Sequence, residues 1–218
     1  MRKLIVILLS LVLALPVTAS QVRELNWDDL VPDIRFDDPF EALTQEQLGM
    51  LAFVARIRTE LAAGTVVSEE TRRETAELEK ELVAEGIDID GLLARRDEIR
   101  RLRTMRGTKA VSELNGAAIR MPGFVLPLEF AGRKVTEFLL VPWIGACIHT
   151  PPPPPNQIVH VVLDEKQGFE SKGRFEPVWV AGRMQNETFS VNLFLKDGAG
   201  DIPIAYRLRA DLVEPYQK

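Results

Sequence analysis

The clearest strand in the chain reads Ala205-Tyr206-Arg207-Leu208-Arg209-Ala210-Asp211-Leu212-Val213. From Tyr206 to Leu212 every even-numbered residue is apolar or aromatic, and every odd-numbered residue is charged. Successive side chains of a strand point to opposite faces. The alternation therefore predicts an antiparallel strand with one face buried and the other in solvent.

Similar short segments fill the chain from about Thr108 onward, and turns containing Gly, Asp or Pro separate them. The other predicted strands are Ala117–Met121, Val125–Phe130, Val135–Val141, Gln157–Leu163, Pro177–Gly182 and Thr188–Leu195. About seven short strands in roughly 110 residues predict a small antiparallel β-barrel, OB-like in form, or a sandwich. We therefore expect a β domain over residues 108–218.

Residues 20–107 are expected to form an acidic arm followed by helices. Five aspartates and two prolines between Leu25 and Ala42 predict an irregular segment. The run Thr44-Gln45-Glu46-Gln47 then has the form of a capping box, which marks the start of a helix. Apolar spacing and glycine stops predict three helices, at about Thr44–Gly64, Ser68–Glu85 and Asp90–Met105.

The second and third helices carry opposite charge. Acidic residues dominate from Glu69 through Glu85, whereas six arginines lie between Arg95 and Arg106. Narrow apolar stripes with opposite charge predict an antiparallel helical hairpin with flanking ion pairs, which would serve as a docking element. The arginines could instead bind an acidic partner or a membrane surface. The expected fold class is α+β, with this charged helical hairpin ahead of the β domain.

The first residues have the pattern of an export signal. Arg2 and Lys3 precede an apolar run from Leu4 to Leu15, and small residues follow up to Ser20. We expect residues 1–19 to be a signal peptide that is cleaved near Ala19, which would export the protein to the periplasm. The apolar run is shorter than the roughly 20 residues of a membrane-spanning helix, so no transmembrane segment is expected after cleavage.

Charge and motifs exclude several functions. Without Arg2 and Lys3 the chain has 25 basic and 32 acidic residues, so nucleic acid is a poor partner. One cysteine excludes an internal disulfide and a C-x-x-C redox cycle. The chain also lacks a G-x-S-x-G elbow, a phosphate loop and an H-E-x-x-H pair. A non-enzymatic role is therefore favoured.

The only cysteine and both histidines lie between Cys147 and His160. Cys147 and His149 are two residues apart, so an extended chain directs thiolate and imidazole to the same side. Five prolines, Pro151–Pro155, follow as a stiff polyproline II rod that can fix the direction of the neighbouring residues. This pattern predicts a site for zinc or another thiophilic divalent metal. His160 would be a third ligand if the strand register brings it close.

Other interpretations of these residues remain open. Cys147 could be the nucleophile of a thiol-dependent enzyme, with His149 or His160 as its base. It could also be a buried, inert thiol in a non-catalytic scaffold or ligand-binding module. His160 lies in the alternating run Ile158–Val162, so it could simply be a hydrogen-bonded histidine on a strand.

Several runs resemble a bacterial exported family known as domain of unknown function 3299; they are Asn26–Pro32, Leu114–Gly116, Arg120–Gly123, Pro142–Gln157 and Val178–Gly182. The Cys-x-His-proline run is the distinctive mark of that family. Its members are exported, some as lipoproteins, although this chain has no lipidated cysteine. Their genes often lie beside genes of ABC transporters, in some cases in zinc-responsive clusters. The resemblance implies an accessory role in zinc handling for an ABC-type transporter.

Overall fold

The structure is a computed structural model that describes residues 21–146, 152–164, 166, 168–171, 173–195 and 198–216. The signal peptide expected at residues 1–19 lies outside the described residues, and so do Cys147 and His149. In the described part of the chain three α-helices precede five of the six strands of one sheet, which confirms the α+β class. No helix within these ranges is long and apolar enough to cross a membrane.

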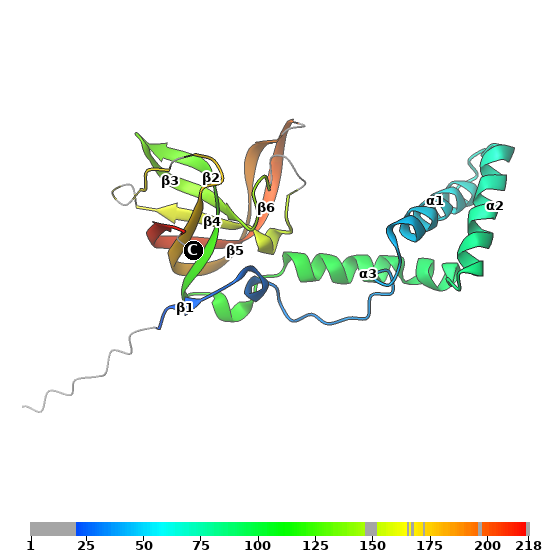
Figure 1. Cartoon of the computed structure of the whole chain (residues 1–218), viewed down its shortest axis with the longest axis horizontal. Helices are drawn as coiled ribbons and strands as arrows, with labels where there is room; N and C mark the ends of the chain where they lie inside the picture. Colours follow the sequence, from blue (N-terminus) through cyan, green and yellow to red (C-terminus); the bar gives the residue numbers. More distant parts are fainter. Residues whose placement is uncertain are drawn as a thin grey trace, which may run out of the picture.

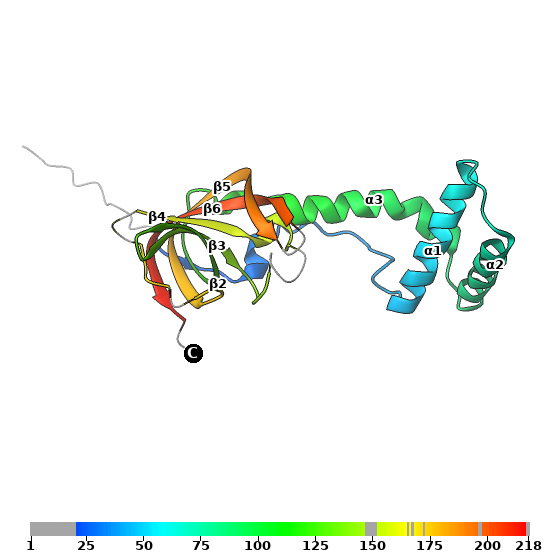
Figure 2. The same cartoon turned by 90° about the horizontal axis from the view of Figure 1, so that it is seen from above.

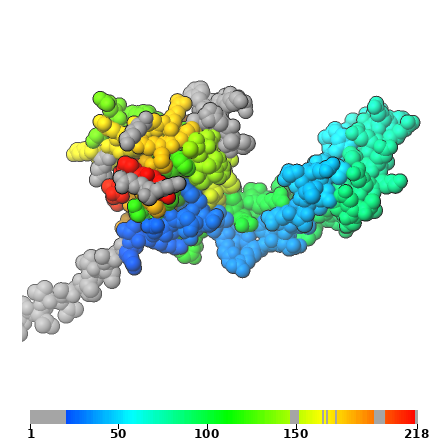
Figure 3. Space-filling view, viewed as in Figure 1, coloured from blue at the N-terminus to red at the C-terminus, as the bar shows by residue number. Residues whose placement is uncertain are grey.

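The molecule is elongated, with the sheet at one end and a helical arm at the other (Figures 1 and 2). The helix α3 (Ile89–Thr108) extends from the sheet to the helical arm. The helices α1 (Gln45–Ala62) and α2 (Glu69–Ala84) lie at the end of α3 that is far from the sheet. The extended segment between η1 (Trp27–Leu30) and α1 runs back along α3. Figure 3 shows the same outline with side chains filled in, the arm projecting well beyond the sheet.

The helices begin where local capping chemistry dictates. Thr44 accepts a hydrogen bond from the backbone of Gln47, and the Gln47 side chain accepts one from the backbone of Thr44, so the predicted capping box is confirmed. Ser68 caps α2 by accepting a hydrogen bond from the backbone of Thr71, without the reciprocal bond of a capping box. α3 is capped by Asp88, two residues before the expected start, and continues through Gly107 to Thr108.

The predicted ion-pair hairpin between the second and third helices is wrong. Arg95 and Arg103 of α3 pair with Asp37 and Asp38 of the extended segment, at 3.3 and 2.6 Å. In the described chain no arginine of α3 pairs with a glutamate of α2. The reason is that α2 packs on α1 and stands across the end of α3, which leaves the arginines beside the acidic segment (Figures 1 and 2).

A small apolar core holds the arm together. It is formed by buried residues from all three helices: Leu51, Val54, Leu82, Ile89 and Leu92. Arg58 of α1 adds ion pairs to Glu79 of α2 at 2.7 Å and to Asp90 at the start of α3 at 2.5 Å. The three helices of the arm are therefore held together by this apolar core and by the ion pairs of Arg58.

The sheet contains one parallel pair among otherwise antiparallel pairs of its main strands. Its strands are β1 (Arg23–Glu24), β2 (Ala118–Ala131), β3 (Lys134–Val141), β4 (Val159–Leu163), β5 (Pro177–Leu195) and β6 (Gly198–Pro215). The pairings run β2–β3–β4–β6–β5 and return from β5 to β2, while the short β1 adds to β2 in parallel. β4 and β6 are parallel, which differs from the all-antiparallel expectation. In the sheet β6 lies between β4 and β5. Because β5 is antiparallel to β6, the chain reverses between them and β6 runs in the same direction as β4.

Four of the predicted strands form two long strands, β2 and β5, because the chain does not turn at Gly123 or Gly182. A Cβ atom at Gly123 in β2 would lie 2.6 Å from the Leu140 side chain and 2.9 Å from that of Trp27. At Gly182 in β5 it would lie 2.1 Å from the carbonyl oxygen of Arg209, beside a register shift. Both glycines therefore allow close approach inside the sheet, and Gly182 marks a bulge.

The strands contribute to two separate apolar clusters. Tyr206, Leu208 and Ala210 point into the larger core, as the alternation predicts, together with Val159 and Val161 of β4. The prediction fails at Leu212, which is 48% exposed near the end of β6. A second cluster lies on the opposite face, where Ile202 and Ile204 of the β5–β6 hairpin pack with residues of β2, β3 and the start of β4: Leu126, Leu139 and Ile158. His160 follows Ile158 by two residues and so belongs to this second face.

Candidate functional site

The segment with Cys147 and His149 joins β3 to η3 (Pro155–Gln157), and its described ends show how it is held. At its start Trp143 and Ile144 are exposed, and Gly145 has a φ of 86°, in the left-handed region that favours glycine. Ala146 is again fully buried. The chain therefore turns outward at Trp143 and inward at Ala146 immediately before Cys147.

The end of this segment is fixed to α3 and to η1. Asn156 is fully buried, and its side-chain amide donates hydrogen bonds to the carbonyl oxygens of Arg106 and Lys109, at 2.7 and 3.0 Å. The last carbonyls of a helix lack partners within the helix, so Asn156 supplies them. Gln157 donates from Nε2 to the carbonyl oxygen of Trp27 at 2.8 Å. The residues that follow the proline run are therefore structural anchors.

The proline run itself also contacts α3. A Cβ atom at Gly107 would lie 3.1 Å from Cβ of Pro154, so a proline ring packs where α3 has no side chain. The sequence predicted that the prolines fix the direction of the Cys-x-His pair, but it did not show that Pro154 and Asn156 contact α3. No local signal connects Asn156 with a helix end some fifty residues earlier. Only the tertiary fold brings them together.

His160 lies on β4 with both ring nitrogens engaged. Nε2 is hydrogen-bonded to Oε1 of Glu137 on β3, and Nε of Arg207 on β6 donates to Nδ1 at 3.3 Å. Because Arg207 can only donate, Nδ1 must be the acceptor, and Nε2 carries the proton towards Glu137. Burial lowers the pKa of His160, although the charge and hydrogen bond of Glu137 raise it. This geometry is that of a neutral histidine.

Arg207 connects His160 to the β5–β6 hairpin. It forms an ion pair with Glu187 at 3.0 Å, and its guanidinium lies 4.6 Å from the ring centre of Phe189. The Phe189 ring also packs edge-on against the imidazole, with 5.1 Å between ring centres. Four strands therefore contribute to one network of two carboxylates, one arginine and one imidazole.

The hydrogen bonds of His160 limit how it could serve as a metal ligand. A metal could bind His160 only by displacing Glu137 or Arg207 from its ring nitrogens. In the described part of the chain, no group of three or more His, Cys, Asp and Glu side chains could hold a metal ion. Cys147 and His149 lie outside the described residues, so their approach to His160 stays a prediction.

A pocket of about 260 Å³ lies beside the start of the Cys-x-His segment. Its lining is aromatic and proline-rich and consists of Trp27, Pro122, Gly123, Phe124, Pro142, Pro177 and Tyr216. Tyr216 stacks on Trp179, and Arg120 in turn lies 4.0 Å from the Trp179 ring centre. Apolar walls with few polar groups are typical of small-ligand sites. The pocket is the second candidate site of the β domain.

Comparison with known proteins gives a family. No curated protein matches the chain. A solved structure similar to it is the crystal structure of a DUF3299 family protein from Pseudomonas aeruginosa PAO1, with 25% sequence identity and a TM-score of 0.49, covering 91% of this chain and 98% of that chain. The family model described as "Protein of unknown function (DUF3299)" matches residues 27–215. The match spans most of the sequence, and this chain therefore belongs to the DUF3299 family.

Proposed function

We propose that this is an exported, periplasmic accessory protein in transition-metal handling, with zinc as the first candidate and an ABC-type transporter as its partner. Cys147 and His149 would bind the ion. The observation that supports this most is the anchoring of the segment's end by Pro154, Asn156 and Gln157. A segment fixed at its end loses less conformational entropy when thiolate and imidazole close on a metal.

Two protein ligands suit a transfer role better than a permanent site. Structural zinc sites are closed by four protein ligands, whereas sites with open positions accept water or a group from a partner. Cys147 and His149 would leave two positions open, and a receiving protein could fill them. The exposed Trp143 and Ile144 beside the site would contribute apolar surface to that encounter.

The β domain is proposed to be a small OB-like barrel. The pairings β2–β3–β4–β6–β5–β2 support this, because they form a ring of five strands with one parallel pair. The arm formed by α1, α2 and α3 projects from it and is the proposed docking element. In this arrangement the metal site lies on the segment that joins β3 to the anchor on α3.

Zinc titration by calorimetry tests the proposal on the reduced mature protein. Cys147→Ser and His149→Ala should each lower the affinity at least about tenfold, which corresponds to about 1.4 kcal/mol. Asn192→Ala is a control with an exposed substitution away from the segment. Unchanged zinc affinity in Cys147→Ser would contradict the proposal. Retained affinity in His160→Gln would limit the ligand set to Cys147 and His149.

A non-catalytic ligand-binding module is the second candidate, and the pocket with Trp27, Phe124 and Tyr216 favours it. In that case zinc would not bind, and Cys147→Ala would leave partner or ligand binding intact. Fragment screening by NMR separates the two proposals. Shifts at Trp27 and Tyr216 that persist in Cys147→Ala would support the module, and their absence in the wild type would reject it.

A further inference from the structure

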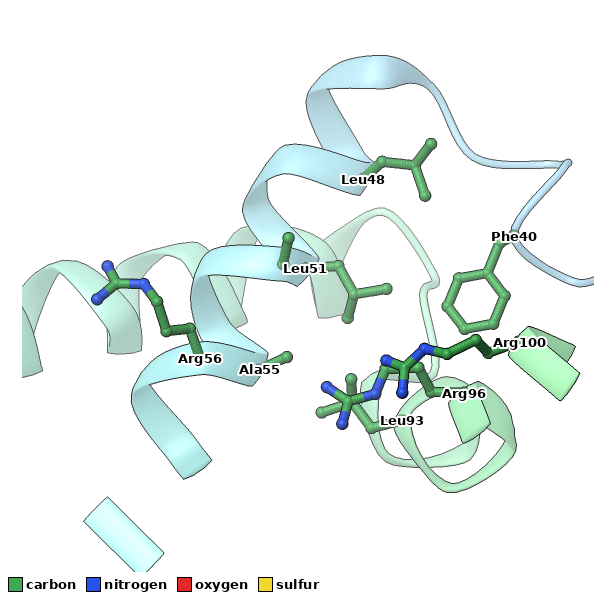
Figure 4. Close-up of a pocket in the computed structure, with 9 residues that line it drawn as sticks. Phe40, Leu48, Leu51, Ala55, Arg56, Leu93, Arg96 and Arg100 are labelled. Carbon is green, nitrogen blue, oxygen red and sulfur yellow. The ribbon is translucent and has the colours of Figure 1, made fainter. Parts of the chain in front are cut away.

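A groove of about 340 Å³ lies between α1 and α3 in the helical arm (Figure 4). Its apolar lining comes from the extended segment and both helices: Phe40, Leu48, Leu51, Ala52, Ala55 and Leu93. Three arginines complete the lining, Arg56 on α1 and Arg96 and Arg100 on α3. Leu51 and Ala55 are buried, whereas the arginines are exposed. The groove therefore has a recessed apolar floor and a basic rim.

The charge of the groove is opposite to that of the whole protein. The chain has a net charge of −5, yet in the part that the structure describes no acidic residue lines the groove. Arg96 and Arg100 are four residues apart on α3, a spacing at which like charges repel. They share one carboxylate, that of Asp97, at 3.5 and 3.0 Å. One positive charge of this pair is left without a carboxylate of its own.

Two other arginines of α3 have acidic partners outside their own helix. Arg103 binds the nearly buried carboxylate of Asp38 at 2.6 Å, and Arg95 binds both the carboxylate and the backbone of Asp37. Among the described residues, the acidic partners of the groove arginines all lie on the same helix as the arginine: Glu60 for Arg56 and Asp97 for Arg96 and Arg100. Such exposed pairs are weak. The groove arginines can therefore exchange them for the carboxylates of a ligand.

We propose that this groove binds an acidic amphipathic helix of a partner protein. One or two large apolar side chains of that helix would enter between Leu51, Ala55 and Leu93, and flanking carboxylates would pair with Arg96 and Arg100. This is helix-in-groove recognition, in which apolar anchors give affinity and charges give specificity. A flat membrane surface fits less well, because the apolar floor lies below the arginine side chains.

The inference deepens the docking role of the arm and rests on the proposed function to that extent. It does not require a metal at Cys147 and His149. Zinc binding and peptide binding are measured separately and on different variants, so failure of one is distinguishable from failure of the other.

Selection from a phage-displayed library of random helical peptides against the whole mature protein is the test. Selected peptides should combine a pair of large apolar residues with Asp or Glu. Their affinity, measured by fluorescence polarisation, should fall about tenfold or more with Arg96→Glu/Arg100→Glu. A peptide with its acids changed to Lys should regain affinity for that variant. Arg73→Glu/Arg101→Glu reverses two exposed arginines, one on α2 and one on α3, outside the groove lining; it is the charge-matched control and should bind normally.

A second variant tests the apolar floor without changing charge. Ala52 is exposed at the groove, so Ala52→Trp should fill it and abolish peptide binding while the arm stays folded. Selected peptides without acidic residues, or with equal affinity for Arg96→Glu/Arg100→Glu, would overturn the proposal. It would also be overturned by arginine-dependent binding to vesicles with anionic lipid but to no peptide. A dimer of this chain that Ala52→Trp dissociates would assign the groove to a second copy instead.

Discussion

The side-chain amide of Asn156 donates a hydrogen bond of 2.7 Å to the carbonyl oxygen of Arg106, within the last turn of α3. A second bond from the same nitrogen reaches Lys109. These bonds attach the end of the segment that contains Cys147 and His149 to the C-terminal end of α3. A change at Asn156 should therefore affect both stability and the metal site.

Asn156→Ala should lower the free energy of unfolding by about 2–3 kcal/mol, because the carbonyl oxygens of Arg106 and Lys109 lose the donor that the fully buried Asn156 supplies. Zinc affinity should fall as well, since the end of the segment is released. Urea unfolding followed by circular dichroism measures the first effect, and calorimetry measures the second. Asn192→Ala makes the same substitution at an exposed position of β5 and should change stability by no more than about 0.5 kcal/mol. Equal effects of the two variants would contradict the anchor.

The Asp38–Arg103 pair should make stability depend on acid pH. The hydrogen bond from Arg103 lowers the pKa of Asp38 below 3.8, and only 3% of the Asp38 side chain is exposed. A carboxyl with a lowered pKa in the folded state stabilises the fold above its unfolded pKa, and this contribution disappears as pH falls through the folded value. The free energy of unfolding should therefore decrease below about pH 4.

Asp38→Asn should remove much of this decrease and cost about 1 kcal/mol at neutral pH, since Arg103 is 53% exposed and the pair is partly screened. Asp37→Asn is the matched control, because the Asp37 side chain is 86% exposed in its pair with Arg95. Urea unfolding of both variants at a series of acid pH values makes the comparison. An acid profile of Asp38→Asn that superimposes on the wild type would show that the pair contributes nothing.

Local chemistry explains which parts of the fold were predictable. The caps at Thr44 and Ser68 and the alternation from Tyr206 to Ala210 depend on neighbours in sequence, and the structure confirms them. The strand breaks expected near Gly123 and Gly182 were wrong because those glycines serve contacts with distant chain segments. Composition does not distinguish a glycine in a turn from one that permits close approach.

Charge complementarity and side-chain partners were harder to predict for a similar reason. In sequence, acidic residues of both α2 and the extended segment are possible partners for the arginines of α3. The packing of the helices brings Asp37 and Asp38 into contact with Arg95 and Arg103. The partners of His160 depend on strand register, which brings β3 and β6 to either side of β4. Sequence reasoning identified His160 as a residue of interest but could not supply Glu137 or Arg207.

His160 should titrate below its ordinary pKa. Burial lowers the pKa from 6.5, against the opposing charges of Glu137 and Glu187 and in the same direction as the charge of Arg207. A histidine with a lowered pKa is neutral in the folded state, so its contribution to stability is present above pH 6.5 and is lost as pH falls towards the folded value. Stability should therefore decline on acidification from neutral pH.

The variant His149→Ala leaves His160 as the only histidine, which makes its imidazole signals easy to assign by NMR. We expect the Nε2–H tautomer and a titration midpoint below 6.5. Glu137→Gln removes the opposing carboxylate and should lower the midpoint further. A midpoint above 6.5 in His149→Ala would show that Glu137 outweighs burial and that the histidine is charged near neutrality.

Alanine substitutions at three glycines should separate tight packing from helix propensity. Gly182→Ala places a Cβ atom 2.1 Å from the backbone oxygen of Arg209, which cannot move without breaking the β5–β6 pairing. We expect a loss of about 3 kcal/mol or more. Gly123→Ala meets the side chains of Leu140 and Trp27, which can shift, so about 1–3 kcal/mol is expected. Gly49 lies inside α1 with no atom within 4 Å of the added Cβ, and Gly49→Ala should stabilise by about 0.5–1 kcal/mol.

Thermal and urea unfolding of the three variants measure this order. The contrast between Gly182 and Gly123 tests whether the obstacle is backbone or side chain, because both lie inside long strands. Gly49→Ala controls for the entropy change that any Gly→Ala substitution causes in the unfolded chain. If Gly182→Ala were as stable as the wild type, the bulge at Ala181 and Gly182 would not need glycine. The continuity of β5 through that point would then have to rest on other contacts.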